Sequence, residues 1–302
     1  MGGIAFVFSG QGDQFPGMGK ELAERCPAAA EVMEFCDRLR PGTSQQCYAG
    51  TEEELKRTEN TQPCLYAVEM AAAAALTSMG IRPEAAAGFS LGEVAACVFA
   101  GALDPENGFR LICERGRLMQ EASDAQDTFM AAVLKLEEEA LGKICADLAE
   151  VYPVNYNCPG QIVVSGRSDQ LPILSEAVRA AGGRVLPLKV SGAFHSPFME
   201  KAADSFYGEL QKTPFMRPQV PVYSNVTAQL YGSDFAGLLS RQICSPVRWE
   251  QLVRNMIGTG IDTFIEIGPG KTLSGLIRKI DRSVRTLAVC DMDEIVEGVR
   301  AC

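Results

Sequence analysis

One short stretch, GFSLGE at residues 88–93, restricts the fold of this chain more than any other feature. A serine with glycine two positions away on either side follows an apolar run at 85–87 and precedes a helical pattern at 91–100. This spacing predicts a strand-to-helix elbow, in which the glycines allow close approach and the serine is held in a strained conformation. The Ser90 hydroxyl would then lie at a helix N-terminus, which stabilises negative charge. The pattern fixes only three positions, so a chance match is the alternative reading.

The chain contains a single histidine, His195. If Ser90 attacks a carbonyl near pH 7, its hydroxyl needs a base, and histidine is the commonest one. His195 lies in a loop of small residues, SGAFHSP at 191–197, after an apolar stretch at 185–190. Loops of this kind often present catalytic side chains. The alternative is a histidine that is simply packed or exposed.

Length and charge exclude several classes of protein. With 302 residues and 47% hydrophobic content, the chain is large enough for one main domain and a subdomain. A net charge of −10 argues against nucleic acid or an anionic membrane as the main partner. The eleven cysteines form no CxxC pair and favour reduced thiols in a cytoplasmic protein. With one histidine, a metal site has few ligands to draw on, so we expect none.

No targeting or membrane segment is evident. Residues 1–8, MGGIAFVF, lack a basic region and a long apolar stretch, and they favour a first buried strand. The most apolar helical segment, 64–79, is interrupted by Glu69 and is too short to cross a bilayer. We therefore expect a soluble, cytoplasmic protein.

Two glycine-rich loops suggest nucleotide binding and fail as nucleotide motifs. In the loop at 9–19, Phe15 occupies a position where a dinucleotide fingerprint needs glycine. In the GPGKT segment at 268–272, Ile265 occupies the place of the first phosphate-loop glycine. The first loop instead predicts a backbone that passes close to another group, with Gln11 directed at it. The second predicts a tight turn before a helix.

Arg115 lies on the apolar side of a predicted helix at 105–123. Leu111, Arg115, Leu118 and Ala122 follow helical spacing and form one stripe. A guanidinium buried there costs several kcal/mol unless a partner satisfies it. One possibility is a buried salt bridge with an internal Asp or Glu. The other is a fork that receives a substrate carboxylate through two parallel hydrogen bonds.

The pattern changes between residues 123 and 189. The order strand, helix, strand, strand, helix, strand within this segment predicts a ferredoxin-like βαββαβ unit inserted between Ser90 and His195. We therefore expect an α/β protein with an α/β-hydrolase-like large subdomain at 1–122 and 190–302, and a ferredoxin-like small subdomain at 123–189. A cleft between them would follow.

Helix signals and strand patterns divide the rest of the chain. Thr51 with Glu54 predicts a capping box, and Asp104 before Pro105 predicts another helix start. Asn60 and the following threonine predict the start of a long alanine-rich helix. Further strands are expected at 4–8, 220–224, 263–267 and 286–289, and further helices at 20–25, 28–39, 199–212, 235–241, 249–258 and 273–280.

One basic segment stands out in an acidic chain. It contains Arg278, Lys279, Arg282 and Arg285. Such a cluster is usually a solvated helix face, and the alternative is a docking site for an acidic partner.

Several segments together resemble the malonyl-CoA:acyl carrier protein transacylases and, more distantly, the acyltransferase domains of polyketide synthases. The resemblance covers essentially the whole chain. Its motifs are GQGDQ at 10–14, NTQP at 60–63, RG at 115–116 with MQEA at 119–122, PVNYN at 153–157 with PGQ at 159–161, and EIGPG at 266–270.

The resemblance implies a role for each residue that matches a family motif. Ser90 would be the nucleophile that becomes malonylated, and His195 would be its base. The backbone N–H groups of Gln11 and Leu91 would form the oxyanion hole. Arg115 would hold the malonyl carboxylate.

Further roles are implied around this centre. In this family a main-chain carbonyl orients the histidine, and the matching residue is Gln242. Asn155 and Asn157 would line the cleft from the small subdomain. The implied partners are malonyl-CoA, as substrate, and acyl carrier protein, with no cofactor.

The elbow departs from the family pattern at one position. It usually reads Gly-His-Ser, and here Phe89 replaces the histidine. Polar help from that position is therefore lost. The stretch AFH at 193–195 resembles the malonyl-selective form of these enzymes, in which Phe194 would block an α-methyl branch of the acyl group. Leu91 favours the same selectivity for malonyl.

The resemblance implies transfer of a malonyl group to carrier protein through a malonyl-Ser90 intermediate with ping-pong kinetics. A second reading is an editing thioesterase, in which water is the acceptor and an Arg115 fork has no use. A third is a non-catalytic scaffold that binds carrier protein. A malonyl adduct on Ser90 would exclude the third.

Overall fold

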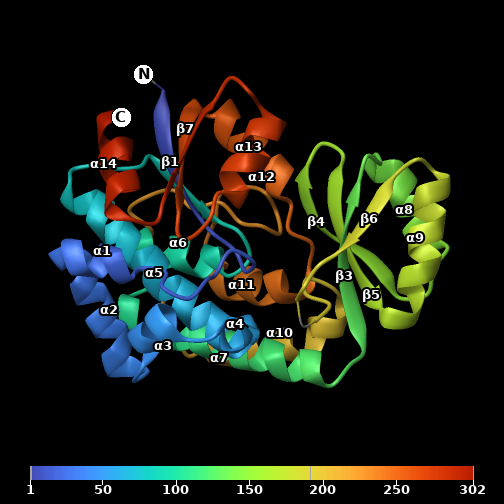
Figure 1. The fold of residues 1–302 in the computed structure, drawn as a ribbon, viewed down its shortest axis with the longest axis horizontal. Helices are drawn as coiled ribbons and strands as arrows, with labels where there is room; N and C mark the ends of the chain where they lie inside the picture. The colour runs from blue at the N-terminus through green and yellow to red at the C-terminus, as the bar shows by residue number, and fades with distance from the viewer. Residues whose placement is uncertain (1, 191, 302) are drawn as a thin grey trace.

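The computed structural model describes residues 2–190 and 192–301, which form an α/β structure with two separate sheets (Figure 1). The first sheet is parallel, with strand order β2-β1-β7-β8. Its strands are β1 (Gly3–Phe8), β2 (Ala85–Gly88), β7 (Ile261–Ile267) and β8 (Arg285–Val289).

The central strand β1 is buried on both faces, as expected of a parallel sheet between two helical layers. Successive side chains of a strand point to opposite faces. Phe6 and Phe8 accordingly join the core formed with α5 (Thr58–Ser78) and α6 (Gly92–Phe99). Ala5 and Val7 join the core formed with α12 (Trp249–Gly258) and α13 (Thr272–Ile280) on the other side.

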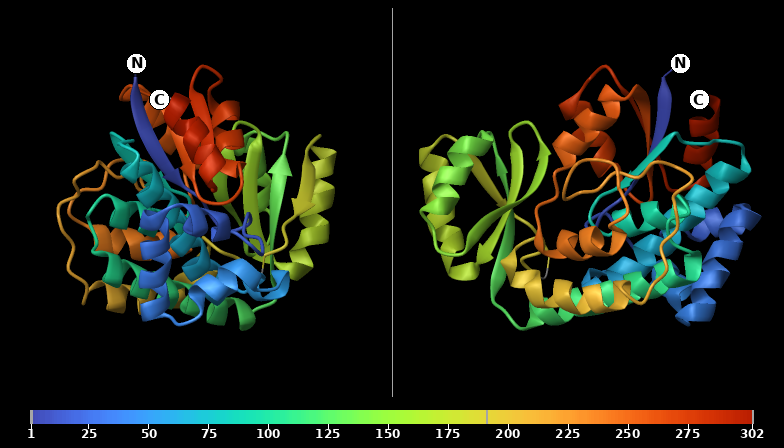
Figure 2. Two further views of the ribbon diagram at one scale, coloured as in Figure 1. Left: turned by 60° about the vertical axis from the view of Figure 1, so that its left-hand side comes forward. Right: turned by 180° about the vertical axis from the view of Figure 1, so that it is seen from behind.

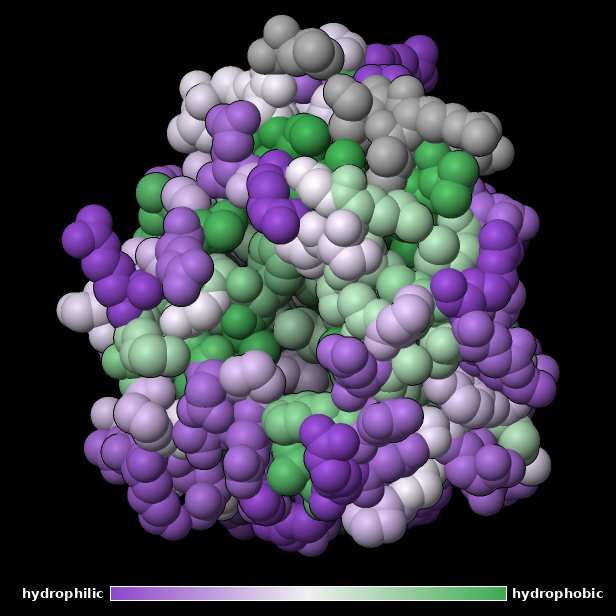
Figure 3. Space-filling model, turned by 90° about the vertical axis from the view of Figure 1, so that its left-hand side faces the viewer, coloured by the Kyte–Doolittle hydropathy of each residue, from purple (hydrophilic) through white to green (hydrophobic). Residues whose placement is uncertain are grey.

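The remaining helices extend this framework. They are α1 (Lys20–Arg25), α2 (Pro27–Leu39), α3 (Thr43–Ala49), α4 (Glu52–Lys56), α7 (Pro105–Asp124), α10 (Glu200–Leu210), α11 (Phe235–Cys244) and α14 (Met292–Ala301). Within the described residues, no helix combines the length and the apolar character that a membrane span requires. Seen from the side of α1 and α2, the surface is hollowed near its middle, and apolar side chains surround the hollow (Figure 3).

The second sheet is antiparallel and lies to one side of the first (Figures 1 and 2). Its strand order is β4-β5-β3-β6, with β3 (Thr128–Leu134), β4 (Val151–Cys158), β5 (Gln161–Arg167) and β6 (Arg184–Pro187). Helices α8 (Glu138–Ala146) and α9 (Leu171–Ala180) cover its outer face. Ala132 and Val163, on the inner face, pack into the core of the first sheet. The element order from β3 to β6 agrees with the predicted βαββαβ order.

Two helix caps confirm the sequence signals. Thr51 and Glu54 form a complete capping box at the start of α4. The Asp104 side chain accepts from Asn107 N at the start of α7, and Pro105 occupies the first turn. Each cap satisfies amides that have no partner within the helix.

The start of one predicted helix and the existence of one predicted strand are wrong. Helix α5 begins at Thr58, before Asn60, because Gln120 on α7 accepts a hydrogen bond from Thr58 N at 2.7 Å. That cap comes from a distant helix, so no local pattern signals it. Segment 220–224 is no strand of either sheet and forms only isolated bridges, Ala86 with Val222 and Tyr223 with Leu230. Pro221 lacks an N–H, so the segment cannot continue a ladder.

The glycines of the elbow carry a stability prediction. A Cβ on Gly92 would lie 2.5 Å from the Phe8 carbonyl oxygen, so β1 or α6 would have to move. We expect Gly92→Ala to lower the free energy of unfolding by about 3 kcal/mol. Gly208→Ala, in α10 with open space around it, should instead raise it by about 0.5–1 kcal/mol. Urea denaturation of both variants measures the difference, and equal stabilities would contradict the packing argument.

Candidate active site

Ser90 lies on the predicted strand-to-helix elbow between β2 and α6. Its φ of 55° is in the left-handed region, which is strained for any residue except glycine. Asn225 holds this conformation: its Oδ1 accepts from Ser90 N at 2.8 Å, and its Nδ2 donates to Gly88 O at 2.7 Å. The elbow and its strain are therefore confirmed.

His195 lies against Ser90. Its Nε2 is 2.8 Å from Ser90 Oγ, and its Nδ1 is 2.8 Å from the Gln242 carbonyl oxygen. A carbonyl oxygen only accepts, so Nδ1 carries the proton and Nε2 is free to receive one from Ser90. Burial, and then the positive charge of Arg115, lower the pKa of His195 to about 4. The imidazole is neutral near pH 7, as a general base must be.

Arg115 reaches the same point from α7. Its Nη2 donates to Ser90 Oγ at 3.2 Å and to Gln242 Oε1 at 2.8 Å, and its Nη1 donates to Gln62 Oε1 at 2.8 Å. Within the described part of the chain, no carboxylate lies within 4.0 Å of the guanidinium, and Nε has no partner. Burial lowers the pKa of Arg115 to about 10, so it remains a cation. A salt bridge, one of the two alternatives that the sequence left open, is absent there, and the guanidinium is bound only by neutral oxygens.

A buried carboxylate completes the cluster. Glu93, in the first turn of α6 and fully buried, accepts from Gln242 Nε2 at 2.7 Å and from Asn225 N at 3.2 Å. Tyr231 also donates its hydroxyl to Glu93. Sequence reasoning assigned no role to Glu93 or Asn225, although Glu93 lies in the elbow stretch itself. A glutamate in the first turn of an apolar helix was the one available signal.

The other predicted residues lie around this centre. Gln11 lies in the loop after β1, and its Nε2 is 3.5 Å from Thr58 Oγ1. Leu91, the residue before α6, is buried, and so is Phe194, next to His195. The loop and the elbow therefore bring Gln11 and Leu91 to the same end of the sheet as Ser90.

Asn155 and Asn157 project from β4 into a cavity of about 230 Å³ between the two sheets. Gln11 and Phe89 line the same cavity from the first sheet. The Oδ1 atoms of both asparagines are buried and have no hydrogen-bond partner within the described residues. Phe89 packs edge-on against Trp249, with ring centroids 5.4 Å apart.

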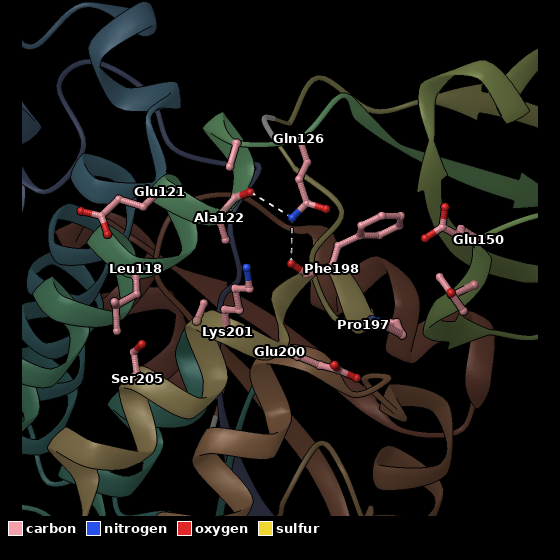
Figure 4. A pocket seen from close by; sticks show the side chains of 13 residues that line it. Leu118, Glu121, Ala122, Gln126, Glu150, Pro197, Phe198, Glu200, Lys201 and Ser205 are labelled. Atoms are coloured by element: carbon pink, nitrogen blue, oxygen red, sulfur yellow. Dashed lines mark hydrogen bonds between the residues drawn. The ribbon is translucent and has the colours of Figure 1, made fainter.

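A larger cavity, of about 580 Å³, lies at the junction of α7, β4 and α10 (Figure 4). None of Ser90, His195 and Arg115 lines it. Gln126 spans its upper side, donating to Ala122 O and to Phe198 O at 3.3 and 3.1 Å. Gln126 therefore links the end of α7, which precedes the second sheet in the chain, to the segment at Phe198, which follows it.

The basic residues of the segment 278–285 are exposed at the surface, and their role as a docking site stays a prediction.

Titration of His195 tests the electrostatics of the site. Because the chain has one histidine, histidine-labelled protein gives a single imidazole signal in NMR spectra. We expect this signal to titrate well below the ordinary 6.5, and Arg115→Ala to raise the pKa. Arg117→Ala, on the exposed face of the same helix, is the matched control and should leave it unchanged. A wild-type pKa of 6.5 or above would contradict the burial argument.

The lowered pKa of His195 also makes the free energy of unfolding depend on pH. The unfolded state binds the proton at higher pH than the folded state, so stability rises with pH in this window. His195 should therefore cost the folded protein up to about 3 kcal/mol as pH falls from 6.5 to about 4.

Comparisons with known proteins identify the family of the chain. Residues 5–293 match the family model described as acyl transferase domain. The malonyl CoA-acyl carrier protein transacylase of Bacillus subtilis is 42% identical over 98% of this chain and 96% of its own. The crystal structure of the Clostridium perfringens enzyme of that name superimposes with a TM-score of 0.96, at 35% identity over 99% of this chain and 96% of its own.

A third similar structure shows a malonyl-transacylase in complex with its type II PKS acyl-carrier protein. It has a TM-score of 0.96 and 34% identity, and covers 99% of this chain and 100% of its own. These similarities extend over almost the full length of each protein. The chain therefore belongs to the acyl transferase domain family and, within it, to the malonyl CoA-acyl carrier protein transacylases.

Proposed function

We propose that this protein transfers the malonyl group of malonyl-CoA to the phosphopantetheine thiol of acyl carrier protein through a malonyl-Ser90 intermediate. One observation carries this proposal. The Ser90 hydroxyl lies between a neutral imidazole, His195, at 2.8 Å and a buried cation, Arg115, at 3.2 Å. The first activates the hydroxyl, and the second selects an acyl group that ends in a carboxylate.

In the first half-reaction, Ser90 Oγ attacks the thioester carbonyl carbon while its proton moves to His195 Nε2. The tetrahedral oxyanion is held by the backbone N–H groups of Gln11 and Leu91. When it collapses, the carbon–sulfur bond breaks and His195 returns the proton to the CoA sulfur. In the second half-reaction, the carrier thiol attacks malonyl-Ser90, gives its proton to His195, and Ser90 regains it.

Arg115 has the geometry to hold the malonyl carboxylate. Its guanidinium is pre-oriented by two amide oxygens, those of Gln62 and Gln242, and it has no anionic partner to displace. A carboxylate arriving beside Ser90 would form two charge-assisted hydrogen bonds with it. The binding free energy of the carboxylate then offsets the free-energy cost of burying the guanidinium.

The cavity between the sheets is the proposed path of the thioester arm. The unpartnered Oδ1 atoms of Asn155 and Asn157 can accept hydrogen bonds from amide N–H groups along such an arm. Phe194, buried beside His195, would exclude a branch at the α-carbon. No cofactor is needed, because every step uses a group of the chain or of the two substrates.

We also propose the division into two subdomains. Residues 1–122 and 190–302 would form an α/β-hydrolase-like subdomain that carries the elbow, and residues 123–189 a ferredoxin-like subdomain. The antiparallel order β4-β5-β3-β6 supports the second part. This arrangement explains why the cavity lies between the sheets.

Mass spectrometry tests the proposed function. The protein is mixed with malonyl-CoA and with methylmalonyl-CoA in parallel, and then with the phosphopantetheine form of a carrier protein. We expect a malonyl adduct on Ser90, little methylmalonyl adduct, and loss of the adduct to the carrier with parallel initial-rate plots. Absence of any adduct would refute the proposal. Faster hydrolysis of the adduct than transfer would make the protein a thioesterase.

A further inference from the structure

We propose that Glu93 is a positioning residue of this site and its fixed counter-charge. Its carboxylate orients Gln242, which in turn positions His195 and Arg115, and its negative charge stabilises the imidazolium that forms when His195 takes the Ser90 proton. The inference rests on the proposed function above and extends it to a residue that touches neither substrate.

The contacts of Glu93 are complete and entirely internal. The residue lies on α6 and is 0% exposed. One carboxylate oxygen accepts from Gln242 Nε2 at 2.7 Å and from Asn225 N at 3.2 Å, and the other accepts from the Tyr231 hydroxyl. A buried carboxylate with three donors around it is held in one orientation.

Gln242 transmits this orientation to the reacting groups. Its Nε2 donates to Glu93 and also to Ser90 O at 2.6 Å. Its Oε1 must therefore face the other way, where it accepts from Arg115 Nη2. The backbone carbonyl of the same residue accepts from His195 Nδ1. A reversed amide would place an N–H against the guanidinium, and an anion at Glu93 prevents that reversal.

Charge balance gives Glu93 its second role. Arg115 is bound only by neutral oxygens, and the negative charge of Glu93 lies one amide away from it. Proton transfer from Ser90 places a second cation, the His195 imidazolium, in the same buried space. A nearby buried anion stabilises such an imidazolium, as the aspartate of a catalytic triad does. Here the anion acts through an intervening amide.

The groups facing Glu93 define its titration. Burial raises the pKa of Glu93 to about 7, while the hydrogen bonds from Tyr231, Gln242 and Asn225 and the charge of Arg115 act in the opposite direction. Tyr231 and Cys97, the other titratable groups that face it, stay neutral because burial raises the pKa of each. Protonation of Glu93 as pH falls through about 7 therefore removes the anion from the site.

The wild-type rate of Ser90 acylation should consequently fall on the acid side near pH 7. The loss does not come from His195, which remains neutral down to a pKa of about 4. The pH profile therefore distinguishes the two groups.

Glu93→Gln removes the charge and keeps the hydrogen bonds. The glutamine Oε1 can accept from Gln242 Nε2 and Asn225 N, and its Nε2 can donate to the Tyr231 oxygen, because a hydroxyl both donates and accepts. Tyr231→Phe is the matched control, because it removes one hydrogen bond from the same carboxyl group and leaves that group able to ionise.

The experiment is rapid-quench measurement of malonyl-Ser90 formation from about pH 5 to about pH 9, over a range of malonyl-CoA concentrations. We expect Glu93→Gln to slow acylation about 30-fold at pH 8, to lose the acid limb near pH 7, and to leave the apparent KM unchanged or lower, because the site becomes more positive. Tyr231→Phe should keep the acid limb but shift it to higher pH, because the lost hydrogen bond had lowered the pKa of Glu93, and it should slow acylation less than about fivefold on the alkaline side of that limb.

The possible outcomes separate the claims. If Glu93→Gln acylates Ser90 at the wild-type rate and keeps the wild-type fall in rate near pH 7, the inference is overturned. So would a loss of rate together with a raised KM and a lowered free energy of unfolding, because that pattern means a structural role alone. If the wild-type protein forms no malonyl-Ser90 at any pH, the proposed function itself fails.

Discussion

Replacing His195 with alanine is expected to slow acylation of Ser90 by malonyl-CoA about 10⁵-fold. Without an acceptor for its proton, the Ser90 hydroxyl is a poor nucleophile near pH 7. No other imidazole is present in the chain to substitute for it. Rapid-quench mass spectrometry of the malonyl adduct measures the rate, and the residual rate reports what the oxyanion donors and Arg115 supply without a base.

Two variants control this experiment. Ser90→Ala should form no adduct at all, which shows that the adduct in the wild type is on that oxygen. Ser196→Ala, at the next position of the same loop, removes only a hydrogen bond to Ala193 O and should slow acylation less than about tenfold. Acylation of His195→Ala within tenfold of the wild-type rate would show that another group acts as base.

Replacing Arg115 with alanine is expected to change substrate preference. We expect kcat/KM for malonyl-CoA to fall about 10³-fold, which is about 4 kcal/mol, because the carboxylate loses a buried, pre-oriented partner. Activity toward acetyl-CoA, which has no carboxylate, should stay level or rise. Initial rates with both thioesters give the ratio.

The charge alone does not replace the fork. Arg115→Lys keeps a cation and loses the planar pair of donors that Gln62 and Gln242 hold in place, so it should recover only part of the malonyl activity. Arg117→Ala, two residues along the same helix and half-exposed, should leave both activities unchanged. An equal loss of both activities in Arg115→Ala would refute carboxylate recognition and indicate disruption of the site.

Both predictions depend on one residue, Gln242. Its backbone oxygen faces His195, its side-chain oxygen faces Arg115, and its amide nitrogen faces Ser90 O and Glu93. A single residue at the end of α11 therefore coordinates the base and the carboxylate receptor. Disturbing Gln242 should affect both half-reactions at once, since the same base and the same fork serve each of them.

Local patterns in the chain were sufficient for the elements that depend on near neighbours. The elbow at Ser90, the capping box at Thr51, the cap at Asp104 and the inward stripe containing Arg115 all follow from spacings of a few residues, and all appear in the structure. Such signals are readable because capping, helical periodicity and glycine conformation act over one or two turns.

The start of α5 was misjudged because a distant partner decides it, whereas the failure of the strand at 220–224 has a local cause in Pro221. Gln120 caps Thr58 from another helix, and Pro221 leaves its segment with isolated bridges beside β2. Glu93 and Asn225, like the start of α5, depend on a distant partner, since their hydrogen bond joins positions 132 residues apart. No pattern within a few residues reports such a contact.

The residue types that carry the proposed chemistry, one serine on an elbow, one histidine and one inward-facing arginine, can thus be read from the chain before it is folded. Their distances, the tautomer of His195 and the neutral surroundings of Arg115 cannot, because six separate segments must pack before those atoms meet. Folding also decided which buried carboxylate balances the site, since burial and hydrogen bonding depend on the assembled core.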